Sequence, residues 1–282
     1  MKRIPKPSWL KVQLPETAEY NWMNKTIKNN NLHTICRSGR CPNAAECWSK
    51  GTATFMILGD ICTRACKFCN VKTGKPNPID KNEPLRIAKS INIMNLKHAV
   101  ITSVDRDDLI DCGVSIWTDT ILKIKELNPN TTIETLIPDF QGKIELIQQI
   151  IDIKPEVISH NLETVKRLTP LIRSKAKYEI SLSVLKTIAD SGIVAKTGIM
   201  LGLGETETEV LETMDNAKAV GVNVFTIGQY LQPSLKNIAV SEYITPEQFK
   251  FYEKEGLKRG FKFVESAPLV RSSYSAEKHA EE

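Results

Sequence analysis

The sequence has no apolar run of about 18 residues, the length that a helix needs to cross a bilayer. Its first eleven residues, MKRIPKPSWLK, contain Pro5 and Pro7 where a secretion signal would need an unbroken apolar segment. Basic runs typical of nucleic-acid-binding tails are also missing, although the 282-residue chain carries a net charge of +5. These absences predict a cytoplasmic protein that binds neither membranes nor nucleic acid, and they favour an acidic protein partner.

Histidine is scarce, with four in the chain, but cysteine is not. Six of the seven cysteines form two triplets, with gaps of four and five residues in the first and of three and two in the second: Cys36, Cys41 and Cys47, then Cys62, Cys66 and Cys69. Reduced cytosolic thiols are expected to bind metal or to react rather than form disulfides. Each triplet is one ligand short of a closed zinc site. We therefore expect two four-iron, four-sulfur clusters, with zinc or incidental buried cysteines as the alternatives.

Short apolar segments alternate with segments of helical spacing along the rest of the chain. The apolar segments predict strands at 52–59, 98–103, 131–138, 156–161, 195–201 and 223–229, and helical patterns follow them, as at 114–127, 141–151 and 205–219. Such alternation is typical of βαβ units in a parallel sheet. Because six units are too few for a closed eightfold barrel, we expect an α/β fold of the partial (β/α)6 TIM type.

The expected organisation is one barrel with an addition at each end. Residues 1–51 form an N-terminal extension with the first triplet, 52–260 form the barrel, and 261–282 run from a short strand into a polar tail. The carboxyl ends of parallel strands share one face, where active sites gather. ICTRACKFC (61–69) and TSVDRDD (102–108) follow the first two strands on this face, so the second triplet lies in the expected active site.

The pattern Cys-x3-Cys-x2-Cys, with Phe68 before its last cysteine, resembles the signature of radical S-adenosylmethionine (SAM) enzymes. The upstream triplet resembles that of the lipoyl synthase family. Further similarity to this family runs over almost the whole chain, in KPSWLK (6–11), ATFMILGDICTRACKFCNV (53–71), ETLIPDF (134–140), HNLETVKRL (160–168), GLGET (202–206), TIGQYLQPS (226–234) and RSSY (271–274). One departure is Cys112, where the family usually has glycine; it concerns a local turn, because cysteine accepts a positive φ less readily.

The resemblance implies an enzyme that inserts sulfur at carbons six and eight of an octanoyl chain carried on a protein lysine. In this family the cluster on Cys62, Cys66 and Cys69 leaves one iron open for SAM, which is cleaved to methionine and a 5′-deoxyadenosyl radical. The cofactor supplies that hard step and the protein positions it. The implied partners are octanoylated lipoyl-carrier domains (H protein and the E2 of 2-oxoacid dehydrogenases), a reductant such as flavodoxin or ferredoxin, and an iron–sulfur carrier protein.

The resemblance also assigns a second, auxiliary cluster to Cys36, Cys41 and Cys47, with Ser273 of RSSY as its fourth ligand. A serine oxygen is a harder donor than thiolate and a poorer match for this soft cluster, which the family consumes as its sulfur source. By itself, RSSY would indicate a polar tail. The alternative functions are another radical SAM enzyme with a second cluster, of the biotin synthase or methylthiolating type, and a zinc-stabilised binding module without catalysis.

The other residues that the resemblance suggests for SAM binding are Phe68, Thr102, Ser103, Asp105, Asn161, Gly202, Glu205 and Gln229. Phe68 would lie near the adenine and Asn161 near the ribose. Structural alternatives stay open for these residues. Phe68 is suited to packing, His160 beside Asn161 to a structural hydrogen bond, and Thr206 with Glu209 to a capping box that starts a helix.

The two triplets predict different defects. Replacing Cys62, Cys66 and Cys69 with alanine should abolish both SAM cleavage and sulfur insertion, because no radical forms. Replacing Cys36, Cys41 and Cys47 should leave slow, unproductive cleavage to 5′-deoxyadenosine with no thiolated product. Chromatography of 5′-deoxyadenosine and mass spectrometry of the carrier measure both outcomes. Loss of all cleavage in a well-folded variant of the first triplet would contradict this division.

Overall fold

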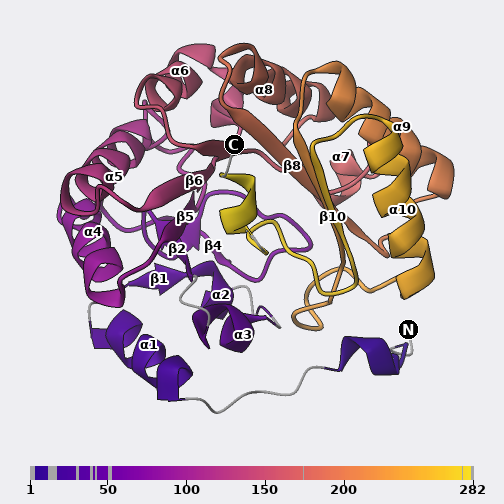
Figure 1. The fold of residues 1–282 in the computed structure, drawn as a ribbon, viewed down its shortest axis with the longest axis horizontal. Coiled ribbons are helices and arrows are strands. Elements are labelled where there is room, and N and C mark those ends of the chain that lie inside the picture. Colours follow the sequence, from indigo (N-terminus) through magenta and orange to yellow (C-terminus); the bar gives the residue numbers. More distant parts are fainter. Residues whose placement is uncertain are drawn as a thin grey trace.

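A curved eight-stranded sheet forms the centre of the molecule (Figure 1). The computed structural model describes residues 4–11, 18–29, 32–38, 41, 43–49, 53–173, 175–274 and 276–280. The strands lie in the order β1 (His33–Thr34), β2 (Ala53–Ile57), β5 (His98–Ser103), β6 (Thr132–Leu136), β7 (Val157–Ser159), β8 (Val194–Leu201), β9 (Val224–Gln229) and β10 (Phe263–Ser266). Only β1 runs antiparallel to its neighbour. Among the described residues β1 and β10 do not pair, so the barrel stays open.

Six helices cover the outside of the sheet, one after each strand from β2 to β9. They are α4 (Glu83–Met94), α5 (Val114–Leu127), α6 (Ile144–Asp152), α8 (Tyr178–Asp190), α9 (Glu207–Ala219) and α10 (Pro246–Lys258). The predicted partial (β/α)6 barrel is therefore confirmed, and β10 extends it by one parallel strand. In the described part of the chain, no helix has the length and apolar character to span a membrane.

Shorter elements lie outside this repeat. The N-terminal part contributes η1 (Ser8–Leu10), α1 (Ala18–Asn29), α2 (Ile35–Ser38) and α3 (Ala44–Ser49). The loop after β2 forms a separate two-stranded sheet of β3 (Ile61–Cys62) and β4 (Lys72–Thr73). The others are η2 (Phe140–Gly142), α7 (Thr169–Ile172) and η3 (Ala276–His279). Because β1 pairs with β2 and β10 with β9, the N-terminal extension, the barrel and the C-terminal segment all contribute to one sheet.

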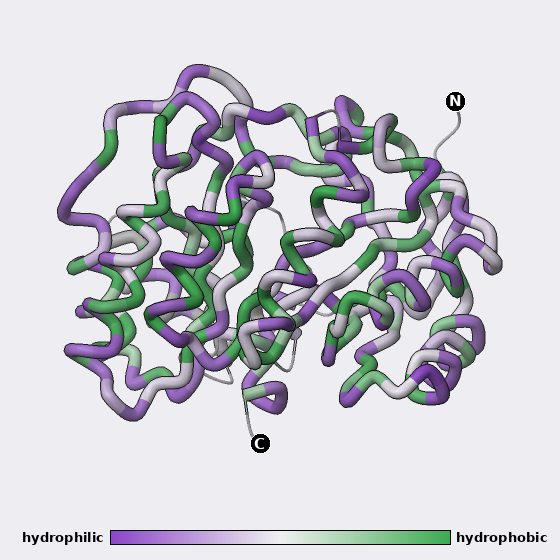
Figure 2. Tube along the Cα trace, turned by 90° about the horizontal axis from the view of Figure 1, so that it is seen from above, coloured by the Kyte–Doolittle hydropathy of each residue, from purple (hydrophilic) through white to green (hydrophobic). Residues whose placement is uncertain are grey.

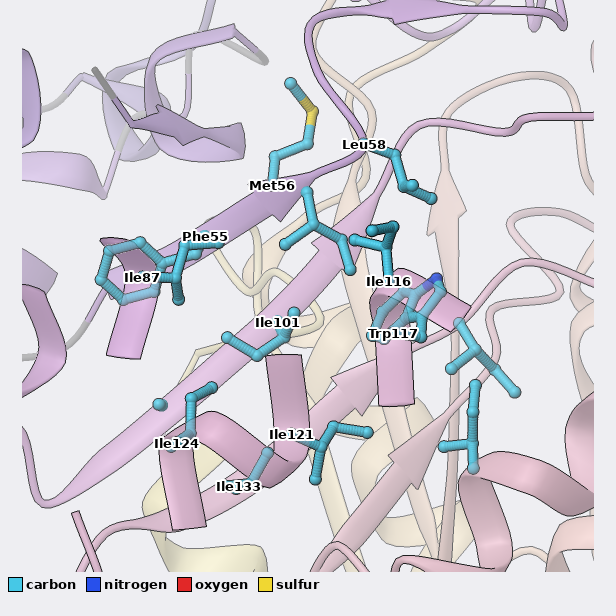
Figure 3. Packing of buried hydrophobic residues seen from close by; sticks show 14 of the residues in the cluster. Phe55, Met56, Leu58, Ile87, Ile101, Ile116, Trp117, Ile121, Ile124 and Ile133 are labelled. Atoms are coloured by element: carbon cyan, nitrogen blue, oxygen red, sulfur yellow. The ribbon is translucent and has the colours of Figure 1, made fainter. Parts of the chain in front are cut away.

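The core explains why these segments form strands and helices. The strands are buried on both faces, as is typical of parallel sheets covered by helices. Phe55, Ile101 and Ile133 on neighbouring strands belong to the same buried cluster as Trp117 and Ile121 on α5 (Figure 3). In the described part of the chain, hydrophobic and hydrophilic residues alternate in short stretches along the coiled segments (Figure 2). Helical spacing thus directs one face of each helix onto the sheet.

The turn before α5 needs a left-handed backbone. Cys112 has φ +50° and Gly113 has φ +84°. A Cβ on Gly113 would lie 2.6 Å from Cδ1 of Leu58, so this glycine is also required for close packing. The departure noted at Cys112 therefore falls where glycine would be less strained, and this chain accepts a buried cysteine there.

Two neighbouring residues of α5 test this packing. Ile121 is fully buried and Leu122 is 53% exposed, and the two side chains have the same number of carbons. Ile121→Ala should lower the free energy of unfolding by about 2–5 kcal/mol, because it leaves a cavity against the sheet. Leu122→Ala should change it by about 0.5 kcal/mol or less. Urea denaturation of both apo variants measures the difference, and equal losses would contradict the orientation of α5.

Candidate active site

A cavity of about 350 Å³ opens at the carboxyl ends of the parallel strands. Cys62, Cys66 and Cys69 line it, together with residues that follow β5, β6, β7 and β9. Phe68 lines it too and packs against the hydrophobic cluster around β8 and β9. The predicted position of the second triplet, on the loop face of the barrel, agrees with this arrangement.

The thiols of the second triplet are free and neutral. None of the six triplet cysteines forms a disulfide. Burial raises the pKa of Cys62 to about 11 and that of Cys66 to about 12, and it also raises the pKa of Cys69. Iron must therefore displace protons when it binds these thiols. The short β3–β4 pair closes the loop that carries them, since the amide of Gly74 donates to the carbonyl of Cys62 at 3.0 Å.

Arg64, inside the Cys-x3-Cys-x2-Cys loop, ties three loops together. Its guanidinium donates to both carboxylate oxygens of Asp107, at 2.8 and 2.9 Å, and to both of Asp139, at 2.7 and 2.9 Å. Its Nε also lies 3.3 Å from Asp105. Burial alone would raise the pKa of Asp139, but the hydrogen bonds from Arg64 outweigh it and hold that pKa at about 2. The loops after β2, β5 and β6 are thus joined by one buried cation. Sequence reasoning missed Arg64 and Asp139, because ion pairing across loops leaves no local pattern.

The last residue of β5 supplies one free polar group to the cavity. The Oγ of Ser103 is buried in the cavity wall and has no hydrogen-bond partner. Thr102 donates to the carbonyl of Leu136 at 3.1 Å, and the carboxylate of Asp105 is occupied by Arg64. The amide of Asp105 also donates to Sγ of Cys62 at 3.3 Å. Ser103 is therefore the residue of TSVDRDD that remains available to a ligand.

The loop after β7 brings an amide and a carboxylate into the cavity wall. Oδ1 of Asn161 is buried and unpartnered, while its Nδ2 donates to Glu163 at 3.1 Å and to Ser272 at 2.7 Å. Glu163 adopts φ +68°, an uncommon conformation for a residue with a side chain, and it lines the cavity. Sequence reasoning missed Glu163, for which the HNLET segment was the available signal.

His160, next to Asn161, has a structural role. Its Nδ1 lies 2.9 Å from the carbonyl of Ile137 and its Nε2 lies 2.9 Å from Oγ of Ser181. Burial lowers its pKa to about 4, so the ring is neutral at physiological pH. Both ring nitrogens are therefore occupied within the fold, and the structural alternative for His160 is confirmed.

Gly202, Glu205 and Gln229, the residues around the turn after β8 that were expected to contact SAM, also make structural contacts there. A Cβ on Gly202 would lie 2.2 Å from Nε2 of Gln229, which donates to the carbonyl of Leu201 at 2.9 Å. The carboxylate of Glu205 accepts from the amides of Gly202 and Leu203, both at 2.9 Å. Gln229 lines the cavity, but Gly202 and Glu205 do not. Close backbone packing accounts for this motif, and the alternative capping box of Thr206 and Glu209 is confirmed.

The first triplet and Ser273 surround a second, smaller pocket. Its lining residues are Cys36, Cys41, Asn43, Cys47, Thr54, Arg271, Ser273 and Tyr274. Ser272 is absent from this lining, so the second serine of RSSY is the one that faces the triplet. Cys36, Cys41 and Ser273 also line the large cavity. Both cysteine triplets therefore reach the same cavity.

The small pocket is lined by three cysteines and a serine whose arrangement differs from that of a single-ion site. Among the described residues, no three Cys, His, Asp or Glu side chains are arranged to hold a single metal ion. This differs from a tetrahedral zinc site, and it suits a cluster in which each thiolate binds a different iron. The space between the side chains is about 10 Å³, so they must turn outward when a cluster binds.

Comparison with known proteins identifies the family. A model of the radical SAM superfamily matches residues 56–217, and a model of the N-terminal domain of lipoyl synthase matches residues 1–41. The lipoyl synthase of Parabacteroides distasonis is 62% identical over 278 residues, 99% of either chain. The chain belongs to the lipoyl synthase family. The lipoyl synthases of Treponema denticola and Porphyromonas gingivalis are 61% and 58% identical, over 97% and 99% of this chain and 94% and 99% of theirs.

Solved structures agree on the fold. HydG, a maturase of the FeFe-hydrogenase, superposes with a TM-score of 0.62 at 12% identity and covers 94% of this chain and 60% of its own. Methylornithine synthase (PylB) gives a TM-score of 0.58 at 11% identity, over 92% of this chain and 84% of its own. At such low identity these similarities show the partial barrel alone.

Lipoyl synthases use SAM and two 4Fe-4S clusters and act on lipoyl-carrier proteins, and the residues of this chain fit these groups. None of the triplet cysteines is in a disulfide, and five of the six line one cavity. Two buried polar atoms without partners, Oγ of Ser103 and Oδ1 of Asn161, face the space that a polar cosubstrate would fill. Such atoms are costly unless a ligand or water satisfies them.

The Arg64 contacts predict a defect in both stability and iron binding. Arg64→Gln should lower the free energy of unfolding by about 3–5 kcal/mol, because it leaves the buried carboxylate of Asp139 without a cation. It should also reduce the iron bound by the second triplet. The stability difference should persist down to about pH 4, near the pKa of an unperturbed aspartate, and shrink as the pH falls through the Asp139 pKa of about 2. A depressed carboxyl pKa stabilises the fold only at pH values where the carboxylate of the folded chain is ionised.

Arg167→Gln is the matched control. Arg167 pairs with Glu209 at 2.6 Å, but its side chain is 56% exposed. Exposed pairs contribute about 0–1 kcal/mol, so this variant should keep its stability and its iron. Chemical denaturation and iron analysis of both variants make the comparison. Equal behaviour would show that Arg64 does not anchor the cysteine loop.

Proposed function

We propose that this chain inserts two sulfur atoms at carbons six and eight of a protein-bound octanoyl-lysine to give lipoyl-lysine, and that it cleaves SAM to 5′-deoxyadenosine and methionine. The observation that supports this best is the meeting of both cysteine triplets and Ser273 at one cavity. When bound at Cys62, Cys66 and Cys69, the radical SAM cluster together with SAM would supply the radical that removes hydrogen from the alkyl chain. The chain's own residues bind and orient the reactants.

The cavity wall offers polar groups to SAM and apolar side chains to the octanoyl chain. Ser103 and Asn161 offer a hydroxyl and an amide oxygen to SAM, and Glu163 adds a carboxylate suited to hydroxyl groups such as those of ribose. Thr102, Asp105 and Gln229 form the wall behind them with polar groups that the fold already uses. Phe68 provides a flat apolar surface for adenine. Apolar side chains give the octanoyl chain a water-excluding surface, among them Met56, Leu136 and Met200.

The auxiliary cluster is proposed to bind Cys36, Cys41, Cys47 and Ser273 and to donate the sulfur. Because Cys36, Cys41 and Ser273 border the cavity, sulfur released there would reach the substrate carbon without crossing the protein. A serine oxygen is a weak partner for this soft cluster, so the iron that it binds can leave when sulfur is transferred. The position of Ser273 suits a ligand that must be released.

The partners proposed for this reaction follow from its chemistry. The octanoylated carriers are the H protein and the E2 of 2-oxoacid dehydrogenases. A low-potential reductant such as flavodoxin or ferredoxin supplies electrons, and an iron–sulfur carrier protein rebuilds the consumed cluster. These partners place the enzyme in the cytoplasm.

Variants of Ser273 test this proposal most directly. In anaerobic assays with an octanoylated carrier, the unmodified chain should form lipoyl-lysine. Ser273→Cys should bind the auxiliary cluster at least as well and keep 5′-deoxyadenosine formation, yet lose most sulfur insertion, because thiolate holds the iron more tightly. Ser273→Ala should lose insertion with a partly depleted cluster. Iron content, 5′-deoxyadenosine and lipoyl product are measured on the same samples.

Ser272→Ala serves as the control for cluster content. Ser272 neighbours Ser273 but does not line the small pocket, so its auxiliary cluster should stay complete. Full lipoyl formation by Ser273→Cys or Ser273→Ala would show that Ser273 is not a ligand. Absence of lipoyl product from the unmodified, fully loaded chain would overturn the proposed reaction itself.

A further inference from the structure

A buried ion pair lies inside the barrel, one layer below the cavity. Lys196 on β8 and Glu134 on β6 are fully buried, with Nζ 2.8 Å from Oε2. Oγ of Ser159 donates to the other carboxylate oxygen of Glu134 at 2.7 Å. Side chains two residues apart on a strand share a face, so Lys196 points inward like Gly198, which lines the cavity. The pair therefore lies on the side of the cavity away from the carboxyl ends of the strands.

The helix η3, near the end of the chain, docks on this pair. Nζ of Lys196 lies 3.2 Å from Nδ1 of His279 and donates to it. The imidazole is 1% exposed and packs against Phe263, with ring centroids 5.4 Å apart. Ala276 is fully buried as well. In Figure 1 the short yellow helix η3 accordingly lies inside the ring of strands and helices. His279 thus anchors the end of the chain in the barrel interior.

A second set of contacts holds the chain upstream of Ser273. The amide of Ala267 donates to the carbonyl of Ile227 at 3.2 Å, and Nδ2 of Asn43 donates to the carbonyl of Leu269 at 2.5 Å. A Cβ on Gly228 would lie 2.1 Å from the carbonyl oxygen of Val270, so the chain passes directly over β9 there. We call residues 267–274 and 276–280 the C-terminal arm. Ser273 lies between the two attachments of this arm.

The weakness of the serine ligand makes both attachments matter. A hydroxyl gains little from binding a soft cluster, so it cannot also offset the entropy of ordering a free chain end. An arm that is fixed on both sides keeps the hydroxyl beside the triplet at a high effective concentration. Tyr274, the residue after Ser273, adds a contact between the arm and the N-terminal extension, since its hydroxyl donates to Glu46 on α3 at 3.4 Å. The ligand can then bind and leave without the arm being lost.

We propose that His279 is a positioning residue for Ser273: by docking on the Lys196–Glu134 pair, it holds the C-terminal arm so that Ser273 stays against Cys36, Cys41 and Cys47. This inference rests on the proposed role of Ser273. In the described part of the chain, the contacts of His279 are with Lys196, Glu265 and Phe263 and with no residue of the second triplet, so we expect its effect to be confined to the auxiliary cluster. Removing the imidazole leaves Lys196 paired with Glu134, which keeps the buried charges balanced and allows the barrel to fold.

The test compares His279→Ala with the adjacent control Lys278→Ala in the full chain, reconstituted anaerobically. Lys278 is on the same short helix but is exposed. His279→Ala should lose auxiliary iron to a chelator about tenfold faster, because a hydrogen bond from a charged donor is gone. Its formation of 5′-deoxyadenosine should match that of Lys278→Ala, and its apoprotein should still unfold in one cooperative transition, at a somewhat lower midpoint because a buried side chain is removed. His279→Asn, which keeps an acceptor for Lys196, should restore most of the iron retention.

A double variant separates this inference from the proposed function. If His279 acts through Ser273, then His279→Ala should add nothing to the iron loss of Ser273→Ala. Additive loss, or equal iron retention by His279→Ala and Lys278→Ala, would overturn the anchoring role while leaving the serine ligand intact. Unchanged iron retention in Ser273→Ala itself would instead refute the ligand assignment on which the inference rests.

Discussion

The cavity depends on a buried cation that the cysteine loop carries itself. Arg64 lies between Cys62 and Cys66 and bonds to carboxylates from the loops after β5 and β6. Loops at the end of an open barrel are otherwise free to move apart, because no further strand closes the sheet. A planar guanidinium with several donors can hold Asp107 and Asp139 at once, which lysine could not do. The loop that carries Cys62, Cys66 and Cys69 is therefore held in place by Arg64, a residue of the same loop, through contacts across the barrel mouth.

The two proposed cluster sites border the same cavity but differ in how the protein supports them. The second triplet lies on a loop closed by the β3–β4 pair and by Arg64. In the first triplet, Cys36 and Cys47 are on short helices of the extension and Cys41 lies between these helices, and the fourth proposed ligand comes from the C-terminal arm. Rigid support suits a cluster that must survive every turnover. Support by a docked chain end suits a cluster that must give up its sulfur.

The residues that sequence reasoning placed best are those with local patterns. The strands, the helix at 114–127 and the capping box of Thr206 and Glu209 follow from spacing and hydrogen bonding within a few residues. Gly202 and Glu205 also have a strong pattern, and close packing against Gln229 and hydrogen bonding to backbone amides are enough to account for it. A glycine that permits approach of a side chain and one that permits approach of a cosubstrate look alike in sequence.

The sequence by itself determined the fold class, the two cysteine triplets and the resemblance to one family, because periodicity and spacing are properties of neighbouring residues. Only the tertiary structure decided which polar groups remain free at the cavity, since Ser103 and Asn161 differ from Thr102 and His160 by partners from other loops. It also decided that His279 lies inside the barrel, and it brings Ser273, which the family resemblance had singled out, to the first triplet. These outcomes depend on contacts between residues far apart in the chain, and such contacts exist only once the sheet has brought its strands together.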